Sequence, residues 1–447
     1  MDTMLDLILT YLAIFDDFLW GYIAVPILMV LGVYFTFKSR FVQIRKLPYI
    51  CKHFFSLILH RSDDSQGGIH PLKAFFACVG GCTGIGNIVA ICTAVQIGGP
   101  GALFWIWVTA IAGMILKYSE VYLGIRYRIA NPNGGYHGGP MYFLKKVFKG
   151  NIIPQLVCLL LCVYGVEIYQ FSVVTTSLSN NLEMNKIVII LIFLGMILAA
   201  ARGGVERVGT ICSRLIPLFL LCYIGMGAWV LINNFSLIPE VLQQIFVSAF
   251  TGHAAVGAFA GSSIMLAISQ GIRRGCYAGD VGVGYASVIH SETSLEKPEK
   301  QAMLAIFDIF VDSFLICTTS VMLVLVTGVW KEPLDSTLLV QNALGLYFPY
   351  MEYFMPVFLF LLGYTTIIAY FCAGLKCAEH LSPGRGKSYY YLYAVLVLLL
   401  FSFVDPSHAL IVMSITGAFL LIINLFGIFQ LRHHVGFVLS DDHITKN

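Results

Sequence analysis

Long apolar runs, separated by short polar stretches, follow one another along almost the whole chain. A helix that spans a bilayer needs about 20 mainly apolar residues. Eleven runs come close to that length or exceed it, and we therefore expect an all-α polytopic membrane protein with about 11 transmembrane helices. The runs are centred on residues 14–37, 74–96, 100–127, 153–179, 186–201, 212–233, 240–269, 303–330, 350–378, 387–404 and 407–431.

The composition agrees with a protein that lies mostly within a membrane. The 447 residues are 58% hydrophobic and only 11% charged, which is outside the range of soluble globular domains. Asp2 and Asp6, rather than basic residues, precede the first run, so we expect no removable signal peptide. Most of the twelve cysteines lie in apolar runs, where they act as small hydrophobes, and their spacing indicates neither a disulfide framework nor a metal site.

The basic residues predict how the chain is oriented, because cytoplasmic loops collect Lys and Arg. If the apolar runs cross the membrane in turn, 24 of the 27 Lys and Arg residues lie on one side, counting loops and helix ends. Lys186 and Lys331 are alone on the other side, and Lys117 lies inside a run. We expect the N-terminus outside and the C-terminus in the cytoplasm of a bacterial-type cell (inner) membrane. The net charge of +3 then comes with a basic inner face suited to anionic membrane lipid, without any sign of nucleic-acid binding.

One apolar run, "ACVGGCTGIGNIVAICTAV" from Ala77 to Val95, contains four glycines and a threonine between Gly80 and Gly86. Non-helical backbone at membrane depth is tolerated only where protein buries it or where it lines a water-filled cavity. The run therefore indicates a broken helix with a polar site. Close helix packing through the glycines is the alternative. A phosphate-binding loop is excluded, because no Gly-Lys-Ser/Thr follows.

A second apolar run, "SAFTGHAAVGAFAGSS" from Ser248 to Ser263, is also interrupted by glycines. When the first run is set aside, each glycine-rich run opens a set of five. Five is odd, so the two sets enter the membrane from opposite sides, and paired interruptions in an inverted repeat point to the mid-membrane site of a secondary transporter. Half-helix N-termini suit a carboxylate and unwound carbonyls suit Na⁺ or an ammonium group, so the pattern favours a zwitterion as the ligand.

Five stretches resemble the alanine or glycine:cation symporters, also called sodium:alanine symporters. They are "TGIGNIVAICTAVQIGGPGALFWIWVTAIAGMILKYSE" from Thr83, "YHGGPMYFL" from Tyr136, "AFTGHAAVGAFAG" from Ala249, "AISQGIRRG" from Ala267 and "YTTIIAY" from Tyr364. The resemblance runs from about Trp20 to the last apolar run. It implies a leucine-transporter-like 5+5 inverted repeat with one extra N-terminal helix, and Na⁺-coupled uptake of small neutral amino acids.

The resemblance also implies site residues. Backbone N–H groups and a hydroxyl at the first break would hold the substrate carboxylate, Asn87 would brace the turn, and Phe259 would cover the small side chain. The implied substrate-binding residues are Thr83, Gly84, Gly86, Asn87, Gln170, Phe259, Gly261, Thr366 and Tyr370. The implied Na⁺ ligands are Ala77, Gly80, Gly81, Thr365 and Thr366. For a lone Thr or Gln, hydrogen bonding between helices is the alternative role, and ordinary packing is the alternative for Phe259.

The chain departs from the family pattern at several positions. In "CYAGDVGVGY", from Cys276, Gly279 and Asp280 stand where the family has asparagine and glutamate. Tyr370 replaces a tryptophan and Lys73 a glutamine. We expect these changes to bear on the cytoplasmic gate and on the exact substrate of a divergent member, while the scaffold stays intact.

Carboxylates inside the apolar runs are candidates for coupling, since a charge at membrane depth is costly. Asp308 and Asp312 lie four apart on one helical face, and Glu167 precedes Gln170 by three. With Asp280 they form the candidate gate and coupling set. They permit H⁺ as the coupling ion in a proton-coupled amino-acid symporter of the same fold. For the two aspartates, wet protein with Arg partners near the cytoplasmic end is the alternative, and we expect Lys117 and Glu120 to form a structural ion pair.

Other functional classes fit the sequence less well. No charged or carbonyl-rich filter recurs as a channel would require, and no nucleophile or His-rich metal set indicates an enzyme. We expect a non-enzymatic symporter that works by alternating access, without an obligatory protein partner. Its expected parts are an extra helix and cytoplasmic linker (1–73), two five-helix repeats (74–235 and 236–431) and a cytoplasmic tail (432–447).

Overall fold

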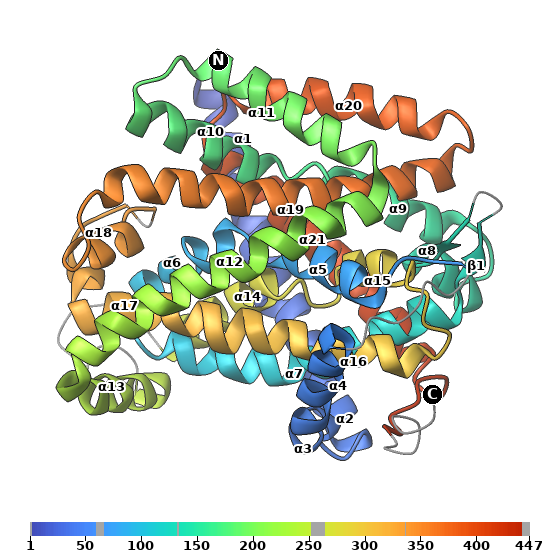
Figure 1. Cartoon of the computed structure of the whole chain (residues 1–447), viewed down its shortest axis with the longest axis horizontal. Coiled ribbons are helices and arrows are strands. Elements are labelled where there is room, and N and C mark those ends of the chain that lie inside the picture. The colour runs from blue at the N-terminus through green and yellow to red at the C-terminus, as the bar shows by residue number, and fades with distance from the viewer. Residues whose placement is uncertain (1, 60–66, 132–133, 252–263, 336, 440–447) are drawn as a thin grey trace.

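The computed structural model describes residues 2–59, 67–131, 134–251, 264–335 and 337–439. Within these ranges the chain is almost entirely helical, with one short two-stranded sheet (Figure 1). The helices up to the middle of the chain are α1 (Asp2–Phe18), π-helical Leu19–Ala24, α2 (Val25–Lys38), α3 (Val42–Arg45), α4 (Leu47–Leu59), α5 (Pro71–Cys82), 3₁₀ Ile85–Asn87, α6 (Ala90–Gly98), α7 (Ala102–Arg126), α8 (Pro140–Phe143), 3₁₀ Leu144–Lys146, α9 (Ile152–Tyr164), α10 (Ile168–Leu182), α11 (Lys186–Ala201) and α12 (Gly204–Asn233).

The remaining elements include the strands, which pair antiparallel through Ile129 with His137 and Ala130 with Tyr136. These elements are β1 (Ile129–Ala130), β2 (Tyr136–His137), 3₁₀ Phe235–Leu237, α13 (Ile238–Thr251), α14 (Ile264–Ala278), α15 (Tyr285–His290), α16 (Pro298–Ile309), π-helical Phe310–Cys317, α17 (Thr318–Thr327), 3₁₀ Val329–Lys331, α18 (Leu339–Gly345), α19 (Met351–Leu381), α20 (Gly386–Phe401) and α21 (Pro406–Gln430).

The predicted apolar runs are mostly helical in the described residues. Among the described residues, seven helices are long and apolar enough to cross a membrane alone, and an eighth is added if the bent pair α5 and α6 counts as one span. Shorter apolar helices cover 47–59, 186–201, 235–251 and 386–401. The chain is thus a multi-pass membrane protein, whereas the number of 11 spans stays a prediction.

Three features differ from the boundaries that hydrophobicity alone predicts. The first helix begins at Asp2, well before the apolar run, and continues through the π-helical turn to Lys38. The predicted span 153–179 is interrupted at 165–167, between α9 and α10. The linker before residue 73 contains α4, whose Phe54 ring packs 5.0 Å from Phe75 and 4.5 Å from Phe307 between ring centroids. Helices end where capping and packing allow, and a hydropathy window does not sense either.

Several helices begin with a sequence signal that satisfies their free N–H groups. Asp405 precedes Pro406 and accepts a hydrogen bond of 2.8 Å from the Ser407 N–H, which caps α21. Asn185 caps α11 through the Ile187 N–H at 2.9 Å. These are the residue types that N-cap positions prefer, and Pro at the first helical position loses no hydrogen bond there.

The molecule is apolar on its outside, and its interior contains buried charged side chains as well as hydrophobic ones. Tyr22, Leu221 and Ile152 expose 76%, 76% and 80% of their surface, as expected for side chains that face lipid. By contrast, the charged residues Lys117 and Asp308 are fully buried. In Figure 1, α5 lies among the long helices, with α19 and α12 on one side and α7 and α16 on the other. This arrangement places the glycine-rich helix break at the centre of the fold.

Close contact between α14 and α7 depends on Gly271. A Cβ atom at this position would lie 2.6 Å from the Ala102 carbonyl oxygen and 2.7 Å from Trp105 Cβ. We expect Gly271→Ala to lower the free energy of unfolding by about 1–3 kcal/mol, because backbone has to move to make room. The midpoint of thermal unfolding in detergent measures the effect.

Gly225→Ala in α12 is the matched control, because a Cβ there meets nothing within 4 Å. Alanine has the higher helix propensity, so this change should be neutral or stabilise by up to about 1 kcal/mol. Equal unfolding midpoints for the two variants would contradict the close packing of α14 on α7.

Candidate functional site

The glycine-rich run forms a broken helix, as its sequence predicts. The axes of α5 (Pro71–Cys82) and the following helical segment Ile85–Gly98 differ by 59°. Thr83 ends α5 with φ −79° and ψ 81°, and Gly84 is extended with φ −116° and ψ −166°. The α-helical hydrogen-bond ladder is therefore interrupted deep in the interior, where every residue from Val79 to Asn87 is buried.

Side chains from the 3₁₀ turn, α10 and α19 satisfy the backbone groups that this break frees. The Gly84 N–H donates to Asn87 Oδ1 at 3.3 Å, and the Ile85 N–H donates to Gln170 Oε1 at 3.2 Å. The Thr366 hydroxyl, from α19, donates to the Gly80 carbonyl at 3.0 Å. Protein groups thus make the hydrogen bonds that water would make and lipid cannot. Irregular backbone is tolerated at this depth only under that condition.

Gly84 has no room for a side chain. A Cβ atom there would lie 2.6 Å from Gln170 Oε1 and 2.8 Å from Thr366 Oγ1. The glycine thus allows α10 and α19 to approach the break closely. Three predicted site residues, Gly84, Gln170 and Thr366, are brought together by this contact.

A second interruption, between α9 and α10, was not predicted. Glu167 takes a left-handed conformation with φ 53°, which is uncommon for a residue with a side chain. A Cβ at neighbouring Gly165 would lie 2.8 Å from the Leu161 carbonyl and 2.9 Å from that of Tyr370, so the glycine permits close contact with α19. Glu167 Oε2 accepts a hydrogen bond of 3.2 Å from Gln170 Nε2. One amide thereby links Glu167 to the break in α5.

The two interruptions face a small interior pocket. Its volume of about 10 Å³ is close to the minimum that holds one water molecule. Backbone of the α5 break, the α10 side chains and the C-terminal end of α14 form its walls. The lining residues are Gly81, Cys82, Gly84, Gly86, Asn87, Tyr164, Glu167, Gln170, Tyr277, Ala278, Asp280 and Tyr370.

Stacked tyrosines close one side of this pocket. The Tyr285 ring stacks on the Tyr370 ring at 3.9 Å between centroids, and Tyr164 meets Tyr370 edge-on at 5.4 Å. The Tyr285 hydroxyl donates to the Ala77 carbonyl at 2.9 Å. Ala77, a predicted Na⁺ ligand, thus has its carbonyl oxygen occupied by a hydrogen bond. Gly81 lies under Tyr285 and lines the pocket.

Lys117 does not pair with Glu120, so that prediction is wrong. Lys117 Nζ lies 2.6 Å from Asp308 Oδ2, with both side chains fully buried, and it also donates to the Gly279 carbonyl at 3.0 Å. Glu120 instead accepts the Ser287 N–H at 3.0 Å, at the start of α15. Residues three apart on one helix reach different neighbours here because α7 packs against both α15 and α16.

The Lys117 ammonium lies among side chains of the types that bind metal ions. Cys78 and Cys82 place their sulfur atoms with an Asp308 oxygen in a cluster, all within 4.8 Å of one another. The ammonium donates to Cys82 Sγ at 2.9 Å as well as to Asp308. A positive charge tethered to the chain therefore fills the position that a metal ion would take.

Asp308 and Asp312 do not lie in wet protein beside arginines, so that alternative for them is wrong. Both side chains are fully buried. Asp312 lies in the π-helical turn Phe310–Cys317 and accepts a hydrogen bond from the Asn87 amide. Asn87 also bonds Gly84, so one side chain joins Asp312 to the break, and π-helical turns are frequent at functional sites.

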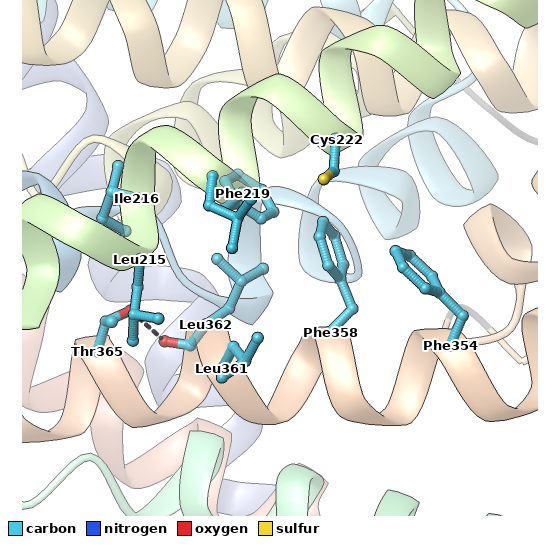
Figure 2. A pocket seen from close by; sticks show the side chains of 10 residues that line it. Leu215, Ile216, Phe219, Cys222, Phe354, Phe358, Leu361, Leu362 and Thr365 are labelled. Carbon is cyan, nitrogen blue, oxygen red and sulfur yellow. Dashed lines mark hydrogen bonds between the residues drawn. The ribbon is translucent and has the colours of Figure 1, made fainter.

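Thr365 and Thr366 point in different directions, because consecutive residues on a helix do not share a face. Thr366 reaches the break. Thr365 donates to the Leu362 carbonyl at 2.9 Å and lines an apolar cavity of about 150 Å³ between α12 and α19 (Figure 2). In Figure 2 the Phe219, Phe354 and Phe358 rings occupy the space between the two helices. Both threonines thus lie near Gly80, where a Cβ would be 3.6 Å from Thr365 Cβ, but the hydroxyl that bonds the Gly80 carbonyl is that of Thr366.

Two predicted residues, Phe259 and Gly261, lie outside the described residues. Among the described ones, sequence reasoning missed Tyr164, Tyr277 and Cys82 as pocket walls. These side chains are indistinguishable from core packing in an apolar run. Ser320 was also missed. It donates to the Asn87 carbonyl at 2.8 Å, and its place in a Thr-Thr-Ser triplet was the one available signal.

Comparison with known proteins places this geometry in context. The model of the sodium:alanine symporter family matches residues 5–446. The chain is 29% identical to the sodium/alanine symporter AgcS of Methanococcus maripaludis, over 86% of this chain and 85% of that protein. It is 27% identical to the probable sodium/glutamine symporter GlnT of Bacillus subtilis, over 95% and 89%.

A solved structure shares the architecture. The crystal structure of MhsT in complex with L-phenylalanine matches 82% of this chain and 90% of its own, with a TM-score of 0.57 and 12% identity. At that identity the likeness shows the fold alone. It confirms the predicted leucine-transporter-like fold, and the inverted repeat within it stays a prediction.

The buried Lys117–Asp308 pair predicts a stability effect. Lys117→Met removes the ammonium and leaves Asp308 buried without its cation, which should cost about 3–5 kcal/mol. The double variant Lys117→Met/Asp308→Leu should recover most of the loss, because neither member of the pair is then left as an unpaired charge. Thermal unfolding of the purified protein in detergent compares the variants.

Lys73→Met is the control, since Lys73 pairs with Glu206 at 2.8 Å but the two side chains are 36% and 63% exposed. Exposed pairs contribute about 0–1 kcal/mol. Similar losses of stability from Lys117→Met and Lys73→Met, or no recovery in the double variant, would show that an unpaired Asp308 carries no large desolvation cost.

Proposed function

This chain belongs to the sodium:alanine symporter family and is a cation-coupled amino-acid symporter rather than an enzyme, and we propose that it couples Na⁺ entry to uptake of small neutral amino acids, alanine or glycine. The observation that carries the proposal is the α5 break, held by Gln170 and Thr366 at the centre of the fold. Relatives named as a sodium/alanine and a probable sodium/glutamine symporter support an amino-acid substrate.

The substrate carboxylate binds at the break in this proposal. Helical segments begin again at Ile85 and at Ala90, and helix N-termini attract anions through their partial positive charge. The Thr83 hydroxyl is buried without a hydrogen-bond partner among the described residues. A buried hydroxyl without a partner is costly, and a bound carboxylate would accept its hydrogen bond.

We assign Na⁺ to the oxygen atoms around Thr366. Its hydroxyl lies 3.0 Å from the Gly80 carbonyl oxygen and 3.5 Å from that of Thr83. Hydroxyl and carbonyl oxygens are the ligands that hard cations prefer. Because Thr83 contributes to both sites, Na⁺ and substrate would stabilise the same conformation of the break, which is the physical basis of coupling.

Transport then follows from rocking of the two five-helix sets (74–235 and 236–431) about this site. The small volume of the pocket supports a closed conformation, in which the stacked Tyr285 and Tyr370 rings close the pocket on the side of Asp280. The bias of basic residues supports a cytoplasmic C-terminus, an external N-terminus and location in the inner membrane.

A proton-coupled cycle is the second candidate. Its support is that Glu167, Asp280 and Asp312 are buried and have no ion-pair partner in the described part of the chain. A buried carboxylate without a cation is most easily accommodated when it is protonated, so one of them would carry H⁺ in place of Na⁺. Asp308 is less suited because Lys117 neutralises it.

Uptake by the purified protein in liposomes separates the two candidates. Labelled alanine or glycine should accumulate under an inward Na⁺ gradient at equal pH on both sides. Accumulation that requires an inward proton gradient and ignores Na⁺ would replace the proposal with the second candidate. Absence of uptake of either amino acid under both gradients would refute the proposed substrate class.

Thr366→Val tests the ion site. The change keeps the shape of the side chain but removes the hydroxyl next to the Gly80 and Thr83 carbonyls, so we expect the Na⁺ concentration for half-maximal uptake to rise about tenfold or more. Thr365→Val should have the smaller effect, because that hydroxyl bonds within α19.

Thr319→Val is the control, since its exposed hydroxyl only bonds the Leu315 carbonyl in its own helix. It should leave the Na⁺ requirement unchanged. An unchanged requirement in Thr366→Val as well would remove Thr366 from the ion site.

A further inference from the structure

The central pocket is lined by two carboxyl groups, whereas a zwitterionic ligand brings a single ammonium group. Glu167 and Asp280 both line it, and neither has an ion-pair partner among the described residues. The described lining contains no Lys or Arg. An α-amino acid brings one carboxylate, which the helix break receives, and one ammonium group. One pocket carboxylate is left without a cationic partner when such a ligand binds.

Glu167 is the carboxylate that remains uncompensated. The Lys117 ammonium and the Tyr370 hydroxyl are neighbours of Asp280. The charged neighbour of Glu167 is Asp280 itself, and its neutral partner is the Gln170 amide at 3.2 Å. An uncompensated buried charge is strongly unfavourable. The α-ammonium alone therefore does not satisfy the site.

The Tyr370 hydroxyl, which lies beside Asp280, is a further polar group of the pocket that a ligand can bond. The side chain is 1% exposed, lines the pocket, and its hydroxyl has no hydrogen-bond partner among the described residues. Buried polar groups are almost always hydrogen-bonded in native structures. A ligand with polar atoms along its side chain would supply such a partner, whereas the methyl group of alanine would not.

The backbone around Glu167 holds its carboxylate in a defined place. Glu167 occupies the left-handed conformation between α9 and α10, and strained conformations of this kind concentrate at ligand-binding sites. The Gln170 amide bonds Glu167 with its nitrogen and the Ile85 N–H with its oxygen. Only the Gln170 amide therefore separates the Glu167 carboxylate from the break. If the ligand carboxylate binds at the break, a short ligand side chain is long enough to reach Glu167.

We propose that Glu167 is a specificity residue, and that the preferred substrate is a small amino acid whose side chain carries a nitrogen hydrogen-bond donor, either an ammonium or an amide. This inference rests on the proposed amino-acid symport, and it replaces alanine or glycine as the preferred substrate with an amino acid that has a polar side chain. Glu167 accepts the side-chain N–H, while Asp280 faces the α-ammonium. A site that hydrogen-bonds a substrate N–H discriminates strongly against an analogue without it, because the buried acceptor is then left unpaired.

Paired ligands test the proposal on the purified full-length protein in Na⁺ buffer. 2,4-Diaminobutyrate and 2-aminobutyrate share a carbon skeleton and differ by the side-chain ammonium, and asparagine supplies an uncharged amide of similar size. We expect the wild type to bind diaminobutyrate, asparagine or both at least tenfold more tightly than 2-aminobutyrate. Which of the two ranks first distinguishes the ammonium from the amide.

Glu167→Gln keeps the size of the side chain and removes its charge. The preference over 2-aminobutyrate should fall at least tenfold for diaminobutyrate. Glu183→Gln is the matched control: Glu183 has the same left-handed conformation, φ 54°, at the other end of α10, but it is exposed. It should leave every affinity unchanged.

The outcomes separate this inference from the proposed function. Equal or tighter binding of 2-aminobutyrate by the wild type would overturn the inference and leave amino-acid symport in place. The inference would also be overturned if Glu167→Gln bound all three ligands as the wild type does. This includes the case in which the variant differs from the wild type only in the pH dependence of uptake. Binding of none of these amino acids, nor of alanine or glycine, would overturn the proposed function and the inference together.

Discussion

The requirement that every backbone N–H and C=O group be paired inside a membrane governs this structure. The chain breaks α5 at its centre, and the freed groups then need partners from elsewhere. Asn87, Gln170 and Thr366 supply them from the 3₁₀ turn, α10 and α19. The helices that carry these side chains have to converge on one point. The same few hydrogen bonds thus determine where the helices pack and where a polar ligand finds a site.

Further polar groups extend outward from that point. Asn87 contacts Asp312, Ser320 bonds both the Asn87 carbonyl and Tyr223, and Tyr285 bonds the Ala77 carbonyl. The Lys117–Asp308 pair lies beside this network and connects α7 with α16. A buried network of this kind is favourable only when nearly all its members are satisfied. Movement of the broken helix therefore has consequences for several helices at once.

The sequence predicts the main architecture because lipid imposes strong patterns. Apolar runs, the glycine-rich break and the contact of Gln170 and Thr366 with it follow from hydrophobicity and resemblance. The partner of Lys117 does not, because charges in three different runs leave several pairings open. The interruption at Glu167 depends on one left-handed residue in an apolar run, which no periodicity reveals. Thr365 and Thr366 are neighbours in sequence, and only the rotation of α19 determines which one meets the break.

The apolar cavity beside Thr365 makes the packing of α19 sensitive to pressure. A space of about 150 Å³ between α12 and α19 is lined by carbon and by little else. Voids of this kind make a conformation more voluminous than one in which the same helices close together, and pressure favours the smaller volume. Hydrostatic pressure is therefore expected to favour the conformations in which α12 and α19 lie closer together.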